Sequence, residues 1–284
     1  MKPSTLLTAL FATTATAASN SSSMVTDCAT GLYMIVARGS GEDPGTGRIG
    51  IVANNVTERI KGSQVVALDY PANFTAYLSS ESIGVTAMRL AIEGYVGKCP
   101  DSKYALLGWS QGAQVSLDTV CGTSDGQLFN KTNPISSDLT RNLVSIVGYG
   151  DPTHVPGLSW TLGTSKNKGL FPRQDTAACD PYASRIRTWC DTGDIYCDGG
   201  NNTAVHSSYF VNYTGAAVDF IVSQYNLMNT SSTGVSSTSS AGPTSSPTTP
   251  ASPTTTSAKN SAAAMSSGTI GYIFAIVLAT ILYA

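Results

Sequence analysis

The sequence predicts a three-layer α/β fold, in which a central parallel sheet of about five strands lies between two layers of helices. Short runs rich in Val, Ile, Leu and Tyr alternate with longer stretches of helical periodicity. That alternation is typical of a parallel sheet covered on both faces. The runs lie between Ser23 and about Asn229, a length that suits one domain with a sizeable core.

Five strands and four helices follow from this pattern. The predicted strands are residues 32–37, 64–69, 104–108, 143–148 and 186–190. The predicted helices are residues 49–61, 83–97, 111–121 and 210–225. In the last helix, the side chains expected to face the sheet are Val211, Ala216, Val218 and Ile221.

The N-terminus has the pattern of a secretory signal peptide. Lys2 gives a basic start, residues 6–12 form a short apolar stretch, and small residues end at Ala17 and Ala18. We expect cleavage after Ala17 or Ala18, so that residues 1–18 are removed. A disordered N-terminal arm is the alternative.

The C-terminus has the pattern of a glycosylphosphatidylinositol (GPI) anchor signal. Residues 269–284 are almost wholly apolar and carry no charge, but a membrane-spanning helix needs ~20 such residues. Small residues and a short spacer precede this tail, so residues 261–284 are predicted to be removed when the lipid is attached at Asn260 or Ser261. A tail-anchored protein is the alternative, and the signal peptide argues against it.

Residues 229–260 form a Ser/Thr/Pro tract without a single aromatic residue. Such a tract cannot bury enough apolar surface to fold, and we expect an extended, O-glycosylated stalk. The folded domain is then residues 19–228. The net charge of −2 and the low charge density exclude the basic surface of a nucleic-acid-binding protein.

Six cysteines lie within the predicted domain: Cys28, Cys99, Cys121, Cys179, Cys190 and Cys197. In an oxidising compartment an even count indicates disulfides rather than a metal site. Six cysteines allow 15 pairings, and only Cys190 and Cys197 are close enough in sequence to suggest a local loop. Asn-x-Ser/Thr sequons agree with passage through the secretory route. They begin at Asn20, Asn55, Asn73, Asn130, Asn201, Asn212 and Asn229.

The third predicted strand ends in Gly108-Trp109-Ser110-Gln111-Gly112, a G-x-S-x-G pattern at a strand-to-helix junction. The glycines let the neighbouring backbone approach closely in the sharp turn. The turn exposes the Ser110 hydroxyl, and the helix that follows aims backbone N–H groups, including that of Gln111, at developing negative charge. The pattern predicts the nucleophile elbow of an α/β-hydrolase, with an ordinary β–α turn as the alternative.

A serine nucleophile needs a base, and the chain has two histidines, His154 and His206. In this fold the residues follow the order Ser…Asp…His along the chain. His206 leaves room for an acid after the fifth strand, whereas His154 does not. We therefore predict His206 as the base and interpret His154 as a surface loop residue that could line the cleft.

The acid is expected in the loop after the fifth strand. Asp191, Asp194 and Asp198 all lie there, and spacing alone does not choose among them. A disulfide between Cys190 and Cys197 would hold one of these carboxylates against the imidazole. A loop aspartate is more often a turn residue than a catalyst.

These residues together resemble the fungal cutinase and acetylxylan esterase family, small α/β-hydrolases without a large lid. The resemblance covers nearly all of residues 28–228 and depends on segments 37–42, 108–112 and 190–206. It implies that Ser40 offers a backbone N–H and a hydroxyl to the oxyanion, and that the backbone N–H of Gln111 is the second donor. It also implies that Asp194 is the acid.

The resemblance also implies disulfide pairings. It pairs Cys28 with Cys99 and Cys190 with Cys197. The remaining Cys121 and Cys179 match cysteines of the acetylxylan esterases.

The predicted function is a secreted, GPI-anchored serine carboxylic ester hydrolase that acts through an acyl-enzyme. Cutinases usually have an apolar residue or two beside the catalytic histidine, so within the resemblance the polar Ser207 and Ser208 beside His206 favour a small acyl group on a carbohydrate. Deacetylation of a polysaccharide such as xylan is therefore the first hypothesis. A cutinase acting on cutin-type or short-to-medium acyl esters is the alternative, and a non-catalytic surface display protein is the second alternative. We expect a monomer without cofactor or metal, whose contact with the membrane is through the lipid anchor alone.

Overall fold

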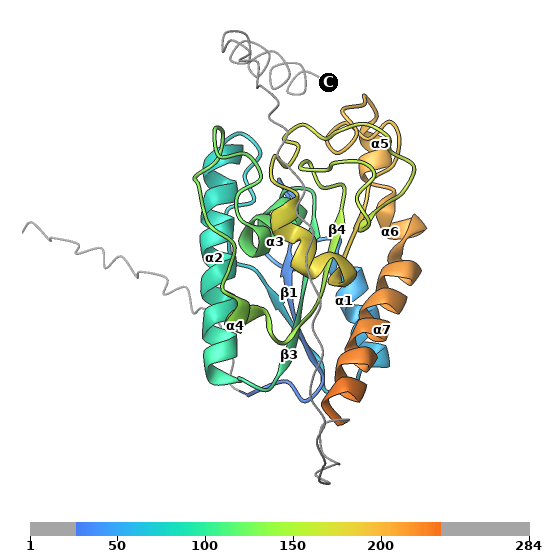
Figure 1. Cartoon of the computed structure of the whole chain (residues 1–284). Helices are drawn as coiled ribbons and strands as arrows, with labels where there is room; N and C mark the ends of the chain where they lie inside the picture. Colours follow the sequence, from blue (N-terminus) through green and yellow to red (C-terminus); the bar gives the residue numbers. More distant parts are fainter. Residues whose placement is uncertain (1–26, 234–284) are drawn as a thin grey trace, which may run out of the picture. The chain divides into compact units, whose positions relative to one another are not determined.

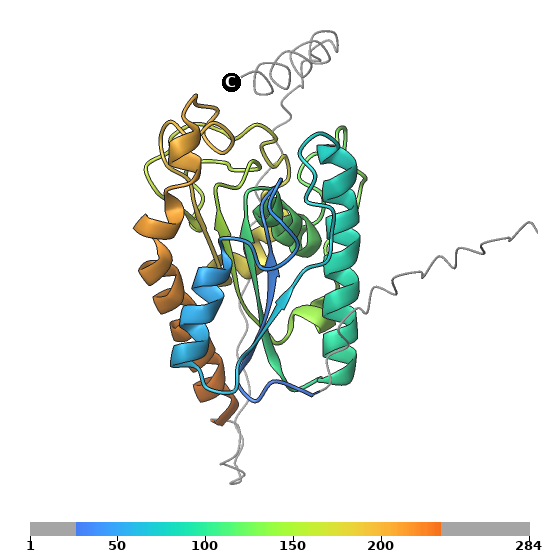
Figure 2. The ribbon, with the colours of Figure 1, turned by 180° about the vertical axis from the view of Figure 1, so that it is seen from behind.

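The computed structural model describes residues 27–233, which form a six-stranded parallel sheet with helices on both faces (Figures 1 and 2). Neighbouring strands follow the order β2-β1-β3-β4-β6-β5, and every pair is parallel. The strands are β1 (Leu32–Ala37), β2 (Gln64–Ala67), β3 (Lys103–Trp109), β4 (Leu143–Tyr149), β5 (Thr161–Leu162) and β6 (Ile186–Trp189). The predicted three-layer α/β architecture is confirmed.

The prediction of about five strands missed β5 at the edge of the sheet. It has two residues, and it pairs with β6 through the bonds from Thr188 N to Trp160 O and from Cys190 N to Leu162 O. A two-residue strand is too short to produce an alternating hydrophobic pattern. The other five strands agree with their predicted ranges to within two residues at either end.

Helices occupy both faces of the sheet. They are α1 (Gly50–Arg59), α2 (Tyr77–Lys98), α3 (Gln111–Cys121), α4 (Ser137–Thr140), the 3-10 helix η1 (Ala177–Arg185), α5 (Thr203–His206), α6 (Tyr209–Asn212) and α7 (Thr214–Thr233). In Figures 1 and 2, α2 lies on one side of the sheet and α1 and α7 lie together on the other.

Alternation along β1 shows how the two cores form. Tyr33, Ile35 and Ala37 pack into the core beneath α2 and α3. Leu32, Met34 and Val36 pack into the core beneath α1 and α7. All six side chains are buried, as expected for a parallel sheet covered on both faces.

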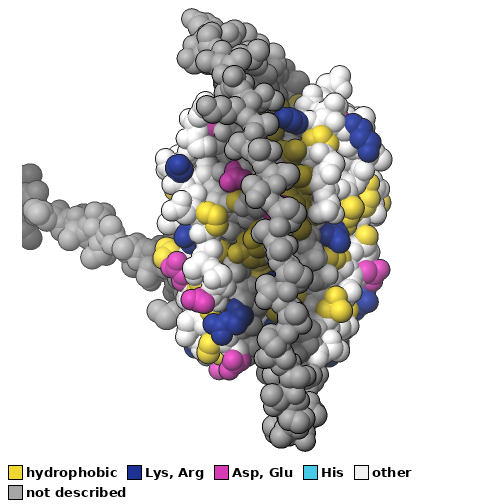
Figure 3. Space-filling model, in the orientation of Figure 1, with side chains coloured by type: hydrophobic (Ala, Val, Ile, Leu, Met, Phe, Trp, Pro, Cys, Tyr) yellow, Lys and Arg dark blue, Asp and Glu magenta, His cyan; other side chains and the backbone are white. Residues whose placement is uncertain are grey.

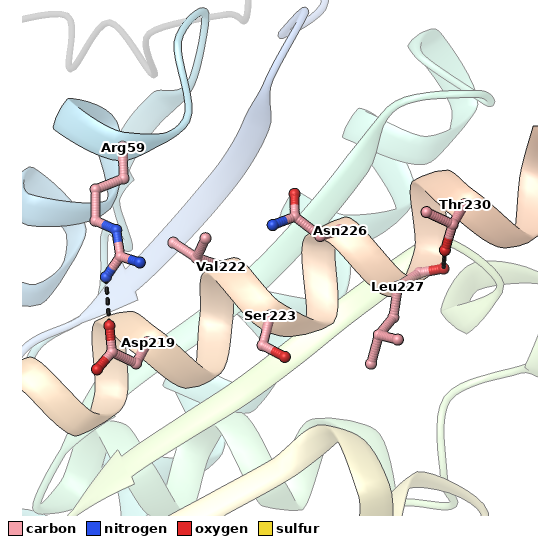
Figure 4. A pocket seen from close by; sticks show the side chains of 7 residues that line it. All are labelled: Arg59, Asp219, Val222, Ser223, Asn226, Leu227 and Thr230. Atoms are coloured by element: carbon pink, nitrogen blue, oxygen red, sulfur yellow. Dashed lines mark hydrogen bonds and ion pairs between the residues drawn. The ribbon is translucent and has the colours of Figure 1, made fainter.

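At the surface, a shallow pocket marks the place where α1 and α7 run side by side (Figure 4). Arg59 of α1 forms an ion pair there with Asp219 of α7. The Arg59 side chain is 47% exposed and that of Asp219 is 71% exposed, so this surface pair contributes at most ~1 kcal/mol.

The prediction for the last helix was partly wrong. The chain turns at Tyr213, between α6 and α7, so the face that packs on the sheet does not continue from one to the other. Val211 is 88% exposed and Ala216 is also exposed. Val218 and Ile221 are buried as predicted, together with Ala217.

Three disulfides join distant parts of the domain in the same pairs that the resemblance implies. Cys28–Cys99 joins the start of the domain to the end of α2, and Cys121–Cys179 joins α3 to η1. Cys190–Cys197 closes the loop after β6. No cysteine in the described part of the chain is free.

Basic and acidic side chains are interspersed on the face shown in Figure 3. Within residues 27–233, no helix is long and apolar enough to cross a membrane. Because α7 continues to Thr233, the first residues of the predicted stalk are helical. The rest of the stalk, the predicted signal peptide and the predicted anchor signal lie outside the described residues.

Candidate active site

Ser110 occupies the sharp turn between β3 and α3. Its φ of 54° and ψ of −122° are strained for a residue with a side chain. Among residues 27–233 the only other non-glycine residue with positive φ is Ala72. Backbone strain of this kind is typical of functional positions.

The flanking glycines are needed for steric reasons. A Cβ on Gly108 would lie 2.3 Å from the carbonyl oxygen of Gly112, and a Cβ on Gly112 would lie 2.1 Å from that of Ala37. A side chain at either position would force β3, α3 and the end of β1 apart. The local sequence therefore determines the turn that presents Ser110.

Gln111 is the first residue of α3, so its backbone N–H has no partner within the helix. The Ser110 N–H donates to Tyr149 O at 2.8 Å, and the Ser110 carbonyl accepts from Ala113 N at 2.9 Å. These bonds fix the backbone on both sides of the Gln111 N–H.

His206 and Asp194 form a direct pair. Nδ1 of His206 lies 2.8 Å from Oδ2 and 3.1 Å from Oδ1 of Asp194. Asp194 is fully buried and His206 is 5% exposed. Nε2 of His206 is also buried and has no hydrogen-bond partner, so it is available to a proton donor.

Asp194 is surrounded by donors. Burial opposes its charge, but the hydrogen bonds from His206 and Tyr209 and the backbone N–H of Cys197 outweigh burial and lower its pKa below the ordinary value. The Tyr209 hydroxyl donates to Oδ2 at 2.6 Å, and Cys197 N donates to Oδ1 at 3.0 Å. The carboxylate is therefore ionised at neutral pH and oriented toward the imidazole.

The other two aspartates of this loop have different partners. Asp191 accepts hydrogen bonds from the Tyr213 hydroxyl and from Thr164. Asp198 accepts from Gly193 N at 2.7 Å and from the Ser165 hydroxyl. Both attach the loop to the segment after β5, and Asp194 alone of the three contacts His206.

The His206 ring packs beside the end of β4. A Cβ on Gly150 would lie 2.6 Å from Cε1 of His206. The ring therefore packs against the Gly150 backbone, where a side chain would not fit. The Trp109 ring packs against the His206 ring in a tilted arrangement, with the ring centroids 5.3 Å apart. Nε1 of Trp109 donates a hydrogen bond to the His206 carbonyl at 3.1 Å. Asn202 caps α5 by accepting from Ala204 N at 2.9 Å. His206 is thus held next to the elbow, although its Nε2 forms no hydrogen bond with Ser110.

Ser40 follows β1, and its hydroxyl oxygen is buried without a partner. Hydrogen bonds hold the segment around it. The Arg38 guanidinium donates to Tyr70 O at 2.7 Å and to Glu42 O at 3.0 Å, and Gly39 N donates to the Glu42 carboxylate at 2.7 Å. A buried hydroxyl in a fixed loop beside the elbow is a suitable donor to an oxyanion.

His154, the other candidate base, lies in a loop, but the predicted surface position is wrong, because segment 169–173 hydrogen-bonds to the backbone of residues 152–154 and covers it. His154 is 4% exposed and neither ring nitrogen has a partner. Burial lowers its pKa to about 4, against the attraction of Asp198 and Asp194. It contacts no carboxylate that could orient it as a base. The structure therefore brings His206, and not His154, into an acid–histidine pair.

Three aromatic residues of the site were missed by the sequence reasoning: Trp109, Tyr196 and Tyr209. Tyr196 lies edge-on to His206 with ring centroids 4.5 Å apart. Tyr209 is separated from Asp194 by fifteen positions, so no local pattern could indicate its hydrogen bond. Within residues 27–233, no group of three or more His, Cys, Asp and Glu side chains could hold a metal ion.

Residues 28–225 match the family model described as Cutinase. The chain is 31% identical to acetylxylan esterase 2 of Talaromyces purpureogenus over 202 residues, which cover 68% of this chain and 86% of that protein. It is 30% identical to cutinase 11 of Verticillium dahliae over 204 residues, covering 69% of each. Among solved structures, the catalytic core domain of acetyl xylan esterase from Trichoderma reesei superposes with a TM-score of 0.65 at 31% identity, covering 69% of this chain and 98% of that one.

Proposed function

The chain belongs to the cutinase family of carboxylic ester hydrolases, and from this premise we propose that it hydrolyses esters with Ser110 as nucleophile, His206 as base and Asp194 as acid. One observation carries the proposal. A buried, ionised Asp194 holds Nδ1 of His206 while Nε2 stays unpartnered beside the strained Ser110 turn. This arrangement can accept a proton from a serine hydroxyl.

The reaction proceeds in two acyl transfers. Ser110 Oγ attacks the ester carbonyl carbon, and its proton passes to Nε2 of His206. The carbonyl oxygen becomes an oxyanion, which receives hydrogen bonds from Ser40 and from the Gln111 backbone N–H. His206 then protonates the departing alcohol, and the acyl group remains on Ser110.

Water completes the cycle. The water oxygen attacks the acyl-enzyme while His206 takes a proton from the water. The proton then passes to Ser110 Oγ as the carboxylic acid product departs. Asp194 stays ionised throughout and stabilises the imidazolium. The Tyr209 hydroxyl keeps its proton because burial and the Asp194 charge raise its pKa far above the ordinary value.

We propose a small acyl group on a polysaccharide, such as the acetyl groups of xylan, as the substrate. Two relatives with about 31% identity are named acetylxylan esterases. Tyr196 covers the edge of His206, and Phe74 contacts Tyr196 at a centroid distance of 6.1 Å. We take this aromatic pair, of which only Tyr196 contacts His206, as support for a small acyl group.

A cutinase-type activity on longer acyl esters is the second candidate. It is favoured by the 30% identity to cutinase 11, which covers as much of this chain as the first acetylxylan esterase does. The non-catalytic display protein receives no support, since the relatives are ester hydrolases and the site has suitable groups for every chemical role.

We further propose that the enzyme is exported and anchored by a GPI lipid at Asn260 or Ser261. Three disulfides favour an extracellular location. The terminal segments 1–18 and 261–284 have the patterns of the two targeting signals. Release of the protein from cells by a phosphatidylinositol-specific phospholipase tests the anchor, and retention by the cells contradicts it.

The substrate test compares the secreted protein with its Ser110→Ala variant. Rates are measured on nitrophenyl acetate, butyrate and a longer chain, together with acetate release from acetylated xylan. Serine-dependent activity restricted to acetyl esters supports a carbohydrate deacetylase. Activity that rises toward butyrate with none on xylan supports the cutinase type, and equal rates for both proteins overturn the catalytic assignment.

A further inference from the structure

Ser80 is a buried polar residue of α2 that the reaction scheme does not use. It is 1% exposed, and its hydroxyl forms two hydrogen bonds outside its own helix. One bond leads to α3 and the other to the loop between β2 and α2. The two partners belong to the two sides of the proposed oxyanion site.

On one side, the Ser80 hydroxyl donates to Oε1 of Gln111 at 2.9 Å. Nε2 of the same amide donates to Tyr77 O, one turn earlier on α2, at 3.2 Å. Gln111 is fully buried, and residues of α2 form hydrogen bonds with both polar atoms of its side chain. The residue whose backbone N–H is the second oxyanion donor is therefore fixed to a neighbouring helix.

On the other side, the Ser80 hydroxyl accepts from Asn73 N at 2.9 Å. Asn73 follows Ala72, whose φ of 48° is unfavourable for a residue with a Cβ. In that conformation the Ala72 carbonyl accepts from Gly41 N at 2.8 Å, immediately after Ser40. The bond at Asn73 thus helps to hold the strained residue that fixes the Ser40 segment.

These contacts form one continuous chain. It runs from Gly41 through Ala72 and Asn73 to the Ser80 hydroxyl, and from there to the Gln111 amide. An oxyanion needs both donors at hydrogen-bond distance from one oxygen position. A single hydroxyl that touches both supporting segments can set the separation between the donors.

We propose that Ser80 is a positioning residue that keeps the two oxyanion-binding segments, at Ser40 and at Gln111, in register. The proposal depends on the ester-hydrolase mechanism above. Ser80 does not touch the substrate, so its effect on turnover is exerted through Ser40 and Gln111.

The kinetic test uses the secreted full chain and nitrophenyl acetate. Ser80→Ala is expected to lower kcat about tenfold with little change in KM, less than the loss of a whole donor. Ser80→Thr keeps the hydroxyl and is expected to restore most of kcat. Ser79→Ala is the matched control, because Ser79 is the exposed neighbour whose hydroxyl donates to the carbonyl of Ala76, the residue just before its own helix.

A double-mutant cycle separates positioning from a merely structural role. Gln111→Met keeps the backbone donor but removes the acceptor of the Ser80 hydroxyl. If the two act as one unit, Ser80→Ala lowers kcat much less in the Gln111→Met background than in the wild type. Additive losses, an unchanged kcat in Ser80→Ala, or a loss of melting temperature without a loss of kcat overturn the proposal.

A second readout distinguishes failure of this proposal from failure of the proposed function. If the wild type has no Ser110-dependent activity, the proposed function is wrong. The link between the Ser40 and Gln111 segments is then tested by comparing the backbone amide NMR resonances of Ser80→Ala with those of the wild type. Shifts at both Gly41 and Gln111 support a link between the two segments. Shifts confined to Asn73 and α2 overturn it.

Discussion

The Tyr209 hydroxyl lies 2.6 Å from Oδ2 of Asp194, the oxygen that also receives Nδ1 of His206. The same hydroxyl accepts from Asp191 N at 3.0 Å. Tyr209 is fully buried at the start of α6, three residues after His206. One side chain therefore supports both the acid and the loop that carries it.

Replacing Tyr209 by Phe is expected to lower kcat about tenfold, since a bond to a charged group is lost. Loss of this donor also raises the pKa of Asp194 toward its ordinary value. The stability that the ionised carboxylate contributes is lost as pH falls through its pKa, so acid unfolding should move to higher pH. Kinetics at pH 7 and acid titration by circular dichroism measure the two effects.

Tyr213→Phe is the matched control for this variant. Its hydroxyl donates to Asp191 and does not touch Asp194. Equal losses of kcat in both variants would show that Tyr209 acts only by stabilising the loop.

Ser40→Ala is expected to separate activity from stability. The Ser40 hydroxyl is buried without a partner, so its removal should leave the free energy of unfolding unchanged or raise it by ~1 kcal/mol. Loss of an oxyanion donor should lower kcat by ~10²–10³. Chemical denaturation and kinetics on the same samples provide the comparison.

Ser145→Ala serves as the control, because Ser145 in β4 also has a buried hydroxyl without a partner. It should match Ser40→Ala in stability while keeping wild-type kcat. A parallel loss of kcat in the two variants contradicts the role given to Ser40.

The raised pKa of Glu81 predicts how the stability of the fold changes toward alkaline pH. Burial, followed by the charge of Asp118, raises the pKa of Glu81 from 4.5 to about 9. The folded chain thus keeps a proton that the unfolded chain releases, and the stability that this proton provides is lost as pH rises from about 4.5 to 9. Glu81→Gln should flatten this decline, so that its melting temperature exceeds that of the wild type most clearly near pH 9.

Glu93→Gln on the same helix is the control, since Glu93 is exposed. Parallel melting curves for the wild type and both variants between pH 5 and pH 9 would refute the buried-proton explanation.

The lowered pKa of His154 predicts that the stability of the fold falls as pH decreases, the opposite of the trend predicted from Glu81. Burial lowers its pKa from 6.5 to about 4, so the unfolded chain binds a proton over that range and the folded chain does not. Stability should fall as pH decreases from 6.5 to 4, and His154→Leu should reduce this fall. Its kcat at pH 7 should remain within about threefold of the wild type.

His206→Ala is the comparison for activity. It should lose activity by ~10³ or more, because it removes the proposed base. If His154→Leu loses activity to the same extent as His206→Ala, the assignment of the base is wrong.

The central sheet could be predicted from sequence because its signals are local. Strand β1 has six consecutive buried residues, and its bounds agree with the predicted range 32–37. The elbow could be predicted equally well, since Gly108, Ser110 and Gly112 lie within five positions and both glycines are required by sterics. Strand β5 could not be predicted, because two residues are too few to show an alternating hydrophobic pattern.

The supporting residues of the site could not be predicted from sequence. Tyr209 reaches Asp194 only because α6 folds back over the loop after β6. Ser80 reaches Gln111 across thirty-one positions, through the packing of α2 on α3. Such contacts depend on how elements pack, and a serine or tyrosine within a helix has no distinguishing pattern of its own.

The Cys190–Cys197 disulfide makes part of the active site depend on oxidation. Cys121–Cys179 joins the far end of α3, the helix that follows Ser110, to η1, and Cys190–Cys197 joins the two ends of the loop that carries Asp194. In a host cytosol that keeps thiols reduced, the loop that carries Asp194, the proposed acid, would keep its hydrogen bonds to Tyr209 and Ser165 but lose its covalent closure. Expression in an oxidising compartment should therefore give a larger fraction of active protein than cytosolic expression, and the yield of folded protein alone is a poor guide to the yield of active sites.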